Sequence, residues 1–337
     1  MSLRIALIVT VTAALGVSLT GCSERPYPAW CVRRTGSSTP VGTYEWRADE
    51  WRDSKRYAAT LDLLRAACVS DLSVDVTGAA ELVVPVPKIT AGASGDATAD
   101  PPLVAFDGDL ERLIAAAGER SIRIHALAGD PGWTDDHAAA QNIVRYIEHF
   151  NNGRTARIES LQFDVEPWGE TRWASERDHL LVKYLEMVRV LTTNAKDGLR
   201  LGFAIPYWFD GTAQAVAAIT FDGLEAFPLT HLMKIVNDAG SFVAVMAYRN
   251  QAFGERGSIG LVPEELREAS GAGVFVVQET AKIDEKSASF FGEDARVFST
   301  QMRKLSKELE RQPQFAGLLL HDVPSLLALL KPRSDAP

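Results

Sequence analysis

An alternation of short apolar segments with longer amphipathic segments constrains the fold of this chain more than any other feature. The short segments end at glycine or polar residues, which is typical of strands that are buried on both faces of a sheet. We predict strands at 42–46, 69–76, 121–128, 158–165, 199–206, 241–248, 273–279 and 315–321. We predict helices at 50–67, 109–117, 135–150, 176–193, 229–238, 263–270, 293–311 and 323–330. Eight such repeats predict a parallel sheet that closes into a barrel.

The predicted domain spans residues 42–332 and is a single (β/α)8 TIM barrel. An open, doubly wound sheet is the alternative, but it would more often carry a glycine-rich phosphate-binding turn after its first strand, and none is visible. Two long loops interrupt the pattern, at 77–106 and at 207–228. We expect the first to be a flexible active-site loop or a small hairpin. Both loops follow the C-terminal ends of strands, where barrel enzymes build their sites.

Residues 1–21 have the pattern of a secretory signal peptide. A positively charged start precedes an apolar run (5–19) that is too short for a transmembrane helix. The run leads into the sequence LTGC, which ends at Cys22 and resembles the lipobox of bacterial lipoproteins; an ordinary signal peptide with a chance cysteine is the alternative. We therefore expect Cys22 to carry lipid, such as palmitate, and residues 22–41 to form a tether. Ser23 then implies a place in the cell envelope, at the outer membrane in a cell that has one.

The remaining composition limits the partners and the chemistry. Cys31 and Cys68 are candidates for a disulfide outside the cytoplasm, with two buried free thiols as the alternative. A net charge of −9 argues against nucleic acid as a partner, and we expect the lipid to be the only membrane contact. The six histidines show no close ligand pair, so we predict neither a metal site nor a cofactor.

The fourth predicted strand carries the most informative acidic residues. Because side chains alternate along a strand, Gln162, Asp164 and Glu166 share one face. The other face, toward the helices, carries Leu161, Phe163 and Val165. Two neighbouring carboxyl groups raise the pKa of one of them, which favours a proton donor near neutral pH. A structural pair held by Arg or backbone donors is the alternative.

Further acids and aromatic residues lie at the same ends of the other strands. We predict Glu166, Asp164, Glu279 and Tyr248 as catalytic candidates. The candidates for substrate binding are Glu45, Trp46, Asp75, Trp168, Tyr207, Trp208, Gln278 and His321. Acids can protonate a glycosidic oxygen and stabilise oxocarbenium charge, while aromatic rings stack on sugar faces. Such a ring of residues indicates carbohydrate chemistry.

The segment FDVEPW, residues 163–168, resembles the fourth strand of chitinase-like (family 18) glycoside hydrolases. The resemblance implies that Glu166 is the acid and that Asp164 assists it. VMAY, residues 245–248, resembles the sixth strand of that family, which implies that Tyr248 positions the substrate. Arg249 departs from the pattern, because an Asp is usual there. Ser160 and Gln162 also stand where Asp is usual, so an N-acetyl-assisted mechanism is not implied.

The chain also resembles the clan of retaining barrel glycosidases. In that clan an acid/base Glu ends strand four and a nucleophilic Glu ends strand seven, the places of Glu166 and Glu279. Val165 stands where that clan has Asn. Both resemblances imply a retaining glycoside hydrolase that acts on a cell-envelope or extracellular polysaccharide. A non-catalytic carbohydrate-binding or envelope-scaffold lipoprotein is the alternative, and a lyase with Glu166 as base is a third possibility.

Overall fold

The strands of this protein form a closed parallel barrel. The computed structural model describes residues 39–82, 101–196, 198–212, 215–254 and 256–331. The barrel strands follow the order β1-β10-β9-β8-β5-β4-β3-β2, and β1 pairs with β10 to close it. Their bounds are β1 Val41–Glu45, β2 Asp71–Asp75, β3 Arg123–Ala128, β4 Ser160–Phe163, β5 Arg200–Pro206, β8 Phe242–Met246, β9 Gly273–Glu279 and β10 Phe315–His321. This confirms the predicted (β/α)8 barrel.

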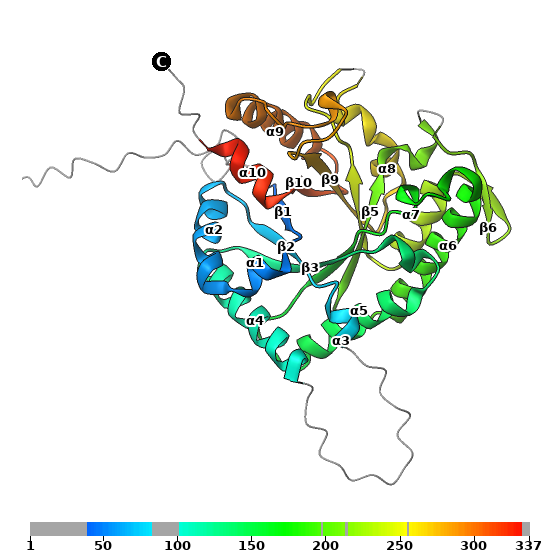
Figure 1. Ribbon diagram of the computed structural model, residues 1–337. Coiled ribbons are helices and arrows are strands. Elements are labelled where there is room, and N and C mark those ends of the chain that lie inside the picture. Colours follow the sequence, from blue (N-terminus) through cyan, green and yellow to red (C-terminus); the bar gives the residue numbers. More distant parts are fainter. Residues whose placement is uncertain (1–38, 83–100, 197, 213–214, 255, 332–337) are drawn as a thin grey trace, which may run out of the picture.

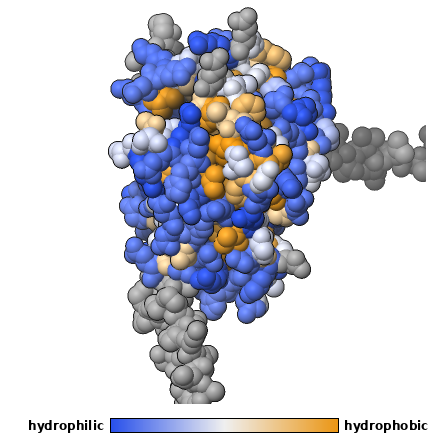
Figure 2. Space-filling view, turned by 90° about the vertical axis from the view of Figure 1, so that its right-hand side faces the viewer, coloured by the Kyte–Doolittle hydropathy of each residue, from blue (hydrophilic) through white to orange (hydrophobic). Residues whose placement is uncertain are grey.

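Helices surround the barrel on its outer side (Figure 1). They are α1 Ala48–Arg52, α2 Ser54–Ala66, α3 Ala79–Leu82, α4 Pro101–Gly118, α5 His137–Asn151, α6 Trp173–Asn194, α7 Pro228–Asp238, α8 Pro263–Glu268, α9 Ala295–Leu309 and α10 Val323–Leu330. Hydrophilic side chains cover most of the face shown in Figure 2, around a smaller apolar area. None of the helices in the described part of the chain is long and apolar enough to cross a membrane.

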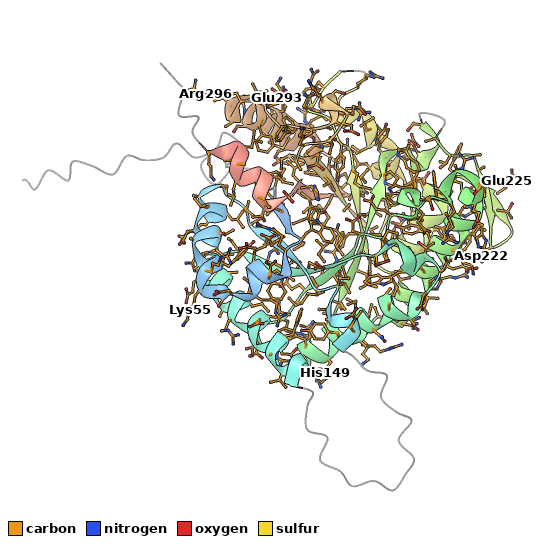
Figure 3. The ribbon with its side chains drawn as sticks, viewed as in Figure 1. Lys55, His149, Asp222, Glu225, Glu293 and Arg296 are labelled. Carbon is orange, nitrogen blue, oxygen red and sulfur yellow. The ribbon has the colours of Figure 1, made fainter. Side chains whose placement is uncertain are left out.

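Side-chain alternation along the strands divides the core into two parts. The larger part lies between strands and helices and includes Leu161, Phe163 and Val165, as predicted for one face of the fourth strand. The smaller part fills the barrel interior and consists of Tyr44, Leu127, Ala244, Val277 and Leu319. Gln162 also lies inside, where its Nε2 donates to the Tyr44 hydroxyl at 3.0 Å. Side chains therefore occupy the space within the ring of strands (Figure 3), and the interior is no open channel.

Three segments differ from the sequence-based prediction. The helix predicted at 50–67 is two helices, because the Asp53 side chain accepts a hydrogen bond from the Arg56 amide and caps a new helix start. In the predicted loop 77–106, α3 and the first turns of α4 are helical, while 83–100 lies outside the described residues. The loop that begins at Tyr207 forms a 3-10 turn and then a small antiparallel hairpin, β6 Ile219–Phe221 and β7 Leu224–Ala226.

Candidate active site

Acidic and aromatic side chains from several strands meet at the C-terminal mouth of the barrel. Tyr248, which follows β8, packs on the interior cluster. Burial raises the pKa of Tyr248 well above its usual value, and the charges of Glu279, Asp164 and Glu166 raise it further. These carboxyl groups from β9 and from the end of β4 therefore lie near one phenol. The four predicted catalytic candidates lie together.

Asp164 and Glu166 form a pair of hydrogen-bonded carboxyl groups, which requires a shared proton. Burial raises the pKa of Asp164, and the charge of Glu166 raises it further, while the charge of His321 opposes the shift. Burial also raises the pKa of Glu166, but hydrogen bonds from Asp164 and Trp168 oppose this. The proton therefore resides mainly on Asp164 at neutral pH. Trp168 Nε1 donates to Glu166 Oε2 at 3.1 Å and orients that carboxyl group.

The backbone around β3 and β4 fixes the position of this pair. The Asp164 amide donates to the Ala128 carbonyl at 2.9 Å, so the chain stays beside β3 after β4 ends. Gly129 allows this approach, because a Cβ there would lie 2.1 Å from the Asp164 carbonyl oxygen. Glu166 lies outside the helical region (φ −113°, ψ 76°), since the proline that follows disfavours helical backbone there, and a 3-10 turn starts at Pro167. The turn leads the chain away from the axis and leaves Glu166 at the mouth.

Glu279 and His321 form a second pair at the ends of β9 and β10. His321 Nδ1 donates to Glu279 at 3.0 Å (Oε2) and 3.1 Å (Oε1), and the Ala281 amide donates to Oε1 at 2.6 Å. Burial alone would lower the pKa of His321, but the hydrogen bond and charge of Glu279 outweigh burial and raise it. His321 therefore keeps its positive charge to a higher pH than a free histidine, and Glu279, which is 4% exposed, has a counter-charge.

Three half-buried tryptophans form an aromatic wall next to Glu166. The Trp168 and Trp208 rings meet edge to face at 5.7 Å, and Trp173 lies 6.1 Å from Trp208. Trp168 and Trp208 were predicted from the sequence, whereas Trp173 was missed. Its signal was its place five residues after Trp168, at the start of the next helix. Trp46 packs on the interior cluster on another side of the mouth.

Two predicted substrate-binding residues are wrong, because the structure places them behind the barrel wall. Glu45 is fully buried and binds Arg47 at 2.8 Å and the Tyr57 hydroxyl at 3.0 Å, on the helix side. Gln278 is also fully buried, where its Nε2 donates to the Ala247 carbonyl at 2.9 Å. Their neighbours Tyr44 and Val277 take the inward positions, since side chains alternate.

The remaining candidates have these places. Asp75 is half-buried at the end of β2, where its Oδ1 accepts from the Thr77 amide at 2.9 Å and burial raises its pKa. Tyr207 follows β5 and accepts a hydrogen bond from Arg249. Cys68 is disulfide-bonded. Cys22 and Cys31 lie outside the described residues, so their predicted roles stay predictions. In the part of the chain that the structure describes, no group of three or more His, Cys, Asp or Glu could hold a metal ion.

The similarity of this chain to known proteins is one of fold. No protein-family model matches the sequence, and a search of curated proteins finds no match. The hyperthermostable endo-1,4-β-D-mannanase of Thermotoga petrophila shares 11% identity over 85% of this chain and 88% of its own, with a TM-score of 0.54. The β-mannanase of the blue mussel Mytilus edulis shares 14% identity over 88% and 92%, with a TM-score of 0.51. A GH18 chitinase from Pseudoalteromonas aurantia shares 11% identity over 87% and 100%, with a TM-score of 0.49. The chain thus shares the (β/α)8 barrel fold with the two mannanases.

Proposed function

We propose that this protein is a retaining glycoside hydrolase that acts on a cell-envelope or extracellular polysaccharide. The observation that carries the proposal is the proton-sharing Asp164–Glu166 pair at the C-terminal mouth of the barrel. A fold alone supports many reactions, and it is this pair with its surroundings that favours glycoside hydrolysis. The aromatic wall of Trp168, Trp173 and Trp208 gives the apolar faces on which sugar rings stack.

Glu166 is assigned the role of general acid and base. In the first step the proton that the pair shares passes from Asp164 to Glu166 and on to the glycosidic oxygen, while the bond from that oxygen to the anomeric carbon breaks. Its carboxylate then takes a proton from the water molecule that attacks the anomeric carbon in the second step. After the second step the proton taken from water returns to Asp164, so Asp164 holds the proton of the resting pair and supplies it to Glu166 for the next reaction.

Glu279 is assigned the role of the nucleophile that attacks the anomeric carbon. Asp164 binds a proton in the resting pair, which suits a partner of Glu166 better than a nucleophile. Glu279 instead faces His321, whose pKa is raised by this hydrogen bond and by the charge of Glu279, and it lies at the same mouth. In a retaining reaction it would form a covalent glycosyl ester, which water later cleaves with the aid of Glu166.

We also propose that the protein is held in the cell envelope by lipid on Cys22. Support comes from the sequence alone, in the apolar run 5–19 and the LTGC motif that follows it. A barrel attached in this way would meet polysaccharide of the envelope or of the surroundings, which agrees with the substrate class proposed above.

The Glu166→Gln variant tests the proposed function on mannan, chitin, peptidoglycan and acidic polysaccharides. We expect the parent protein to release reducing ends from at least one of them, and the variant to lose this activity by a factor of about 100 or more. Glu170→Gln is the matched control, because Glu170 lies nearby but binds Arg172 at 2.7 Å. Labelling with a 2-deoxy-2-fluoro glycoside, followed by mass spectrometry, would then place the covalent sugar on Glu279.

The non-catalytic alternative predicts a different result. A carbohydrate-binding lipoprotein would bind one of these glycans, release no reducing ends, and bind equally well as Glu166→Gln. That outcome would overturn the enzyme assignment. A covalent label on a residue other than Glu279 would leave the hydrolase in place but overturn the assigned nucleophile.

A further inference from the structure

Arg249 is a half-buried arginine at the mouth of the barrel that has no acidic partner among the described residues. It directly follows Tyr248 at the end of β8. Its Nη1 donates to the Tyr248 carbonyl at 2.6 Å, and its Nη2 donates to the Tyr207 hydroxyl at 3.2 Å. The guanidinium carbon lies 5.3 Å from the centroid of the Tyr207 ring. All of these partners are uncharged, and the buried Nε has no hydrogen-bond partner in the described structure.

Other arginines at this rim are neutralised. Arg47, after β1, binds Glu45 at 2.8 Å. Arg172, after the turn that follows β4, binds Glu170 at 2.7 Å. Half-buried cations normally have such partners, because removing a charge from water costs free energy that a counter-charge offsets. Arg249 keeps a full positive charge and unused N–H donors at a mouth that otherwise carries carboxyl groups.

A neutral sugar chain gives no physical reason for this charge, whereas an acidic sugar chain does. The carboxyl groups of Asp164, Glu166 and Glu279, together with a net charge of −9, would repel an anionic polysaccharide. A planar guanidinium matches a carboxylate through two parallel hydrogen bonds. Stacking on Tyr207 holds the Arg249 group in one orientation while leaving it without a counter-charge.

We propose that Arg249 binds a carboxylate of the glycan, so that the substrate is a polysaccharide of carboxylate-bearing sugars. The carboxylate belongs to a uronic acid of the backbone or to an acidic ether substituent on the sugar ring. Tyr207 is the positioning residue that orients the guanidinium. The inference rests on the proposed function in taking the mouth of the barrel to be a glycan site, but it concerns binding and not turnover.

Affinity electrophoresis of the full chain tests the inference without hydrolysis, in the Glu166→Gln background. Native gels would contain polygalacturonate, alginate or soluble peptidoglycan strands freed of their peptides, each beside its carboxyl-reduced form, and mannan as a neutral polymer. We expect at least one acidic polymer to retard the protein and its reduced form to lose the effect. Polyuronates would indicate a uronic acid, and peptidoglycan would indicate the ether-linked carboxylate.

Variants then assign the binding to Arg249. Arg249→Met should weaken binding to the acidic polymer about 10-fold or more, and Arg249→Lys and Tyr207→Phe should each weaken it less. Arg189→Met is the matched control, because Arg189 also stacks on an aromatic ring, that of Phe221, at 5.0 Å. It pairs with Asp222, which Figure 3 shows at the outer edge of the molecule. Thermal melting of each variant verifies folding, and Tyr207→Phe keeps the test decisive if Arg249→Met does not fold.

Three outcomes would overturn the inference: no acidic polymer retards the chain, the carboxyl-reduced polymers retard it equally, or Arg249→Met binds like its parent. The proposed function can fail separately. A chain that binds acidic glycan through Arg249 and hydrolyses none would uphold this inference and overturn the hydrolase. A chain that hydrolyses only neutral glycans and does not bind the acidic ones would uphold the hydrolase and overturn this inference.

Discussion

Carboxyl groups at the mouth of the barrel are accommodated in two ways. Asp164 and Glu166 share a proton, which removes one negative charge from a pair that is partly enclosed. Glu279 instead keeps a histidine, His321, beside it as a counter-charge. One pair therefore binds a proton between two carboxyl groups, whereas the other places a carboxyl group against a histidine. This division of roles is what a two-carboxylate glycosidase needs.

Asp164→Asn tests the stored proton through the pH dependence of stability. The raised pKa means that the folded protein keeps a proton that the unfolded chain has already lost. The free energy of unfolding therefore falls as pH rises from the unfolded pKa to the folded pKa of Asp164, by at most about 1.4 kcal/mol per pH unit. We expect the variant to lack this decline and to be inactive. Urea unfolding at several pH values measures it, and parallel pH curves for both proteins would contradict the raised pKa.

Glu265 on α8 is a buried acid with no role in the proposed site. It is fully buried, and neither carboxylate oxygen has a hydrogen-bond partner in the described structure. Burial raises its pKa well above the usual value. We expect Glu265→Gln to raise the free energy of unfolding at pH 8, by about 1–3 kcal/mol, since no carboxylate has to be buried or protonated there. Glu264→Gln, at an exposed neighbour that binds Arg267, is the control, and equal effects would refute the explanation.

Single-residue errors in the sequence-based prediction have one cause. Glu45 and Gln278 were predicted because they stand at strand ends, but the prediction did not determine whether they or the adjacent residues face the barrel interior. The alternation anchored on Tyr44 and Val277 assigns both to the helix side. For β4 the predicted faces were correct, because the apolar residues Leu161 and Phe163 indicated the face that points to the helices. To predict a site residue, one must therefore know which face of the strand it lies on as well as that it stands at the strand end. Partners on neighbouring strands, such as His321 for Glu279, depend on the order of strands across the barrel.

The turns that end two helices determine where the following strands begin. Helices α2 and α4 end in the same way, with the Val69 amide bonded to the Leu64 carbonyl at 3.0 Å and the Ile122 amide bonded to the Ala117 carbonyl at 3.0 Å. The left-handed residues at these ends are Cys68 and Ser121, each with φ of 58°. Glycine is usual at such positions, so the sequence carried no signal there. Strands predicted to start at 69 and 121 begin two residues later for this reason.

Gly129→Ala tests the close contact between the end of β3 and the active-site pair. The added Cβ would lie 2.1 Å from a backbone oxygen of Asp164, which has no flexible side chain to yield. We expect the free energy of unfolding to fall by about 1–3 kcal/mol, and activity to fall further because Asp164 is displaced from Glu166. Gly118→Ala is the control, since no atom lies within 4 Å of a Cβ there and alanine favours helix. Full activity in Gly129→Ala would show that the contact does not position the pair.

Closure of the barrel is the step that turns scattered residues into one site. The pairing of β1 with β10 brings residues from both ends of the sequence together, so Tyr44 lies 6.2 Å from His321 between ring centroids. The eight repeats predicted this closure, and closure placed the predicted catalytic acids Asp164, Glu166 and Glu279 at one mouth. The sequence could not predict which carboxyl groups share a proton, because that depends on distances set by packing. In the sequence, Arg249 was noted only because it stands where the family 18 pattern has Asp. The structure shows that its hydrogen-bond partners are uncharged, which is why we propose that it binds a carboxylate.

Attachment of the whole molecule depends on residues ahead of the barrel. The full chain has a net charge of −9 and is repelled by anionic lipid headgroups, so lipid on Cys22 should be the dominant attachment. We expect the full chain expressed in bacteria to partition into the detergent phase of Triton X-114 and to incorporate labelled palmitate. Cys22→Ser should lose the label and move to the aqueous phase, whereas Cys31→Ser should stay with the detergent. If both variants partition like the parent, attachment does not depend on Cys22, and the apolar run 5–19 itself would be the anchor.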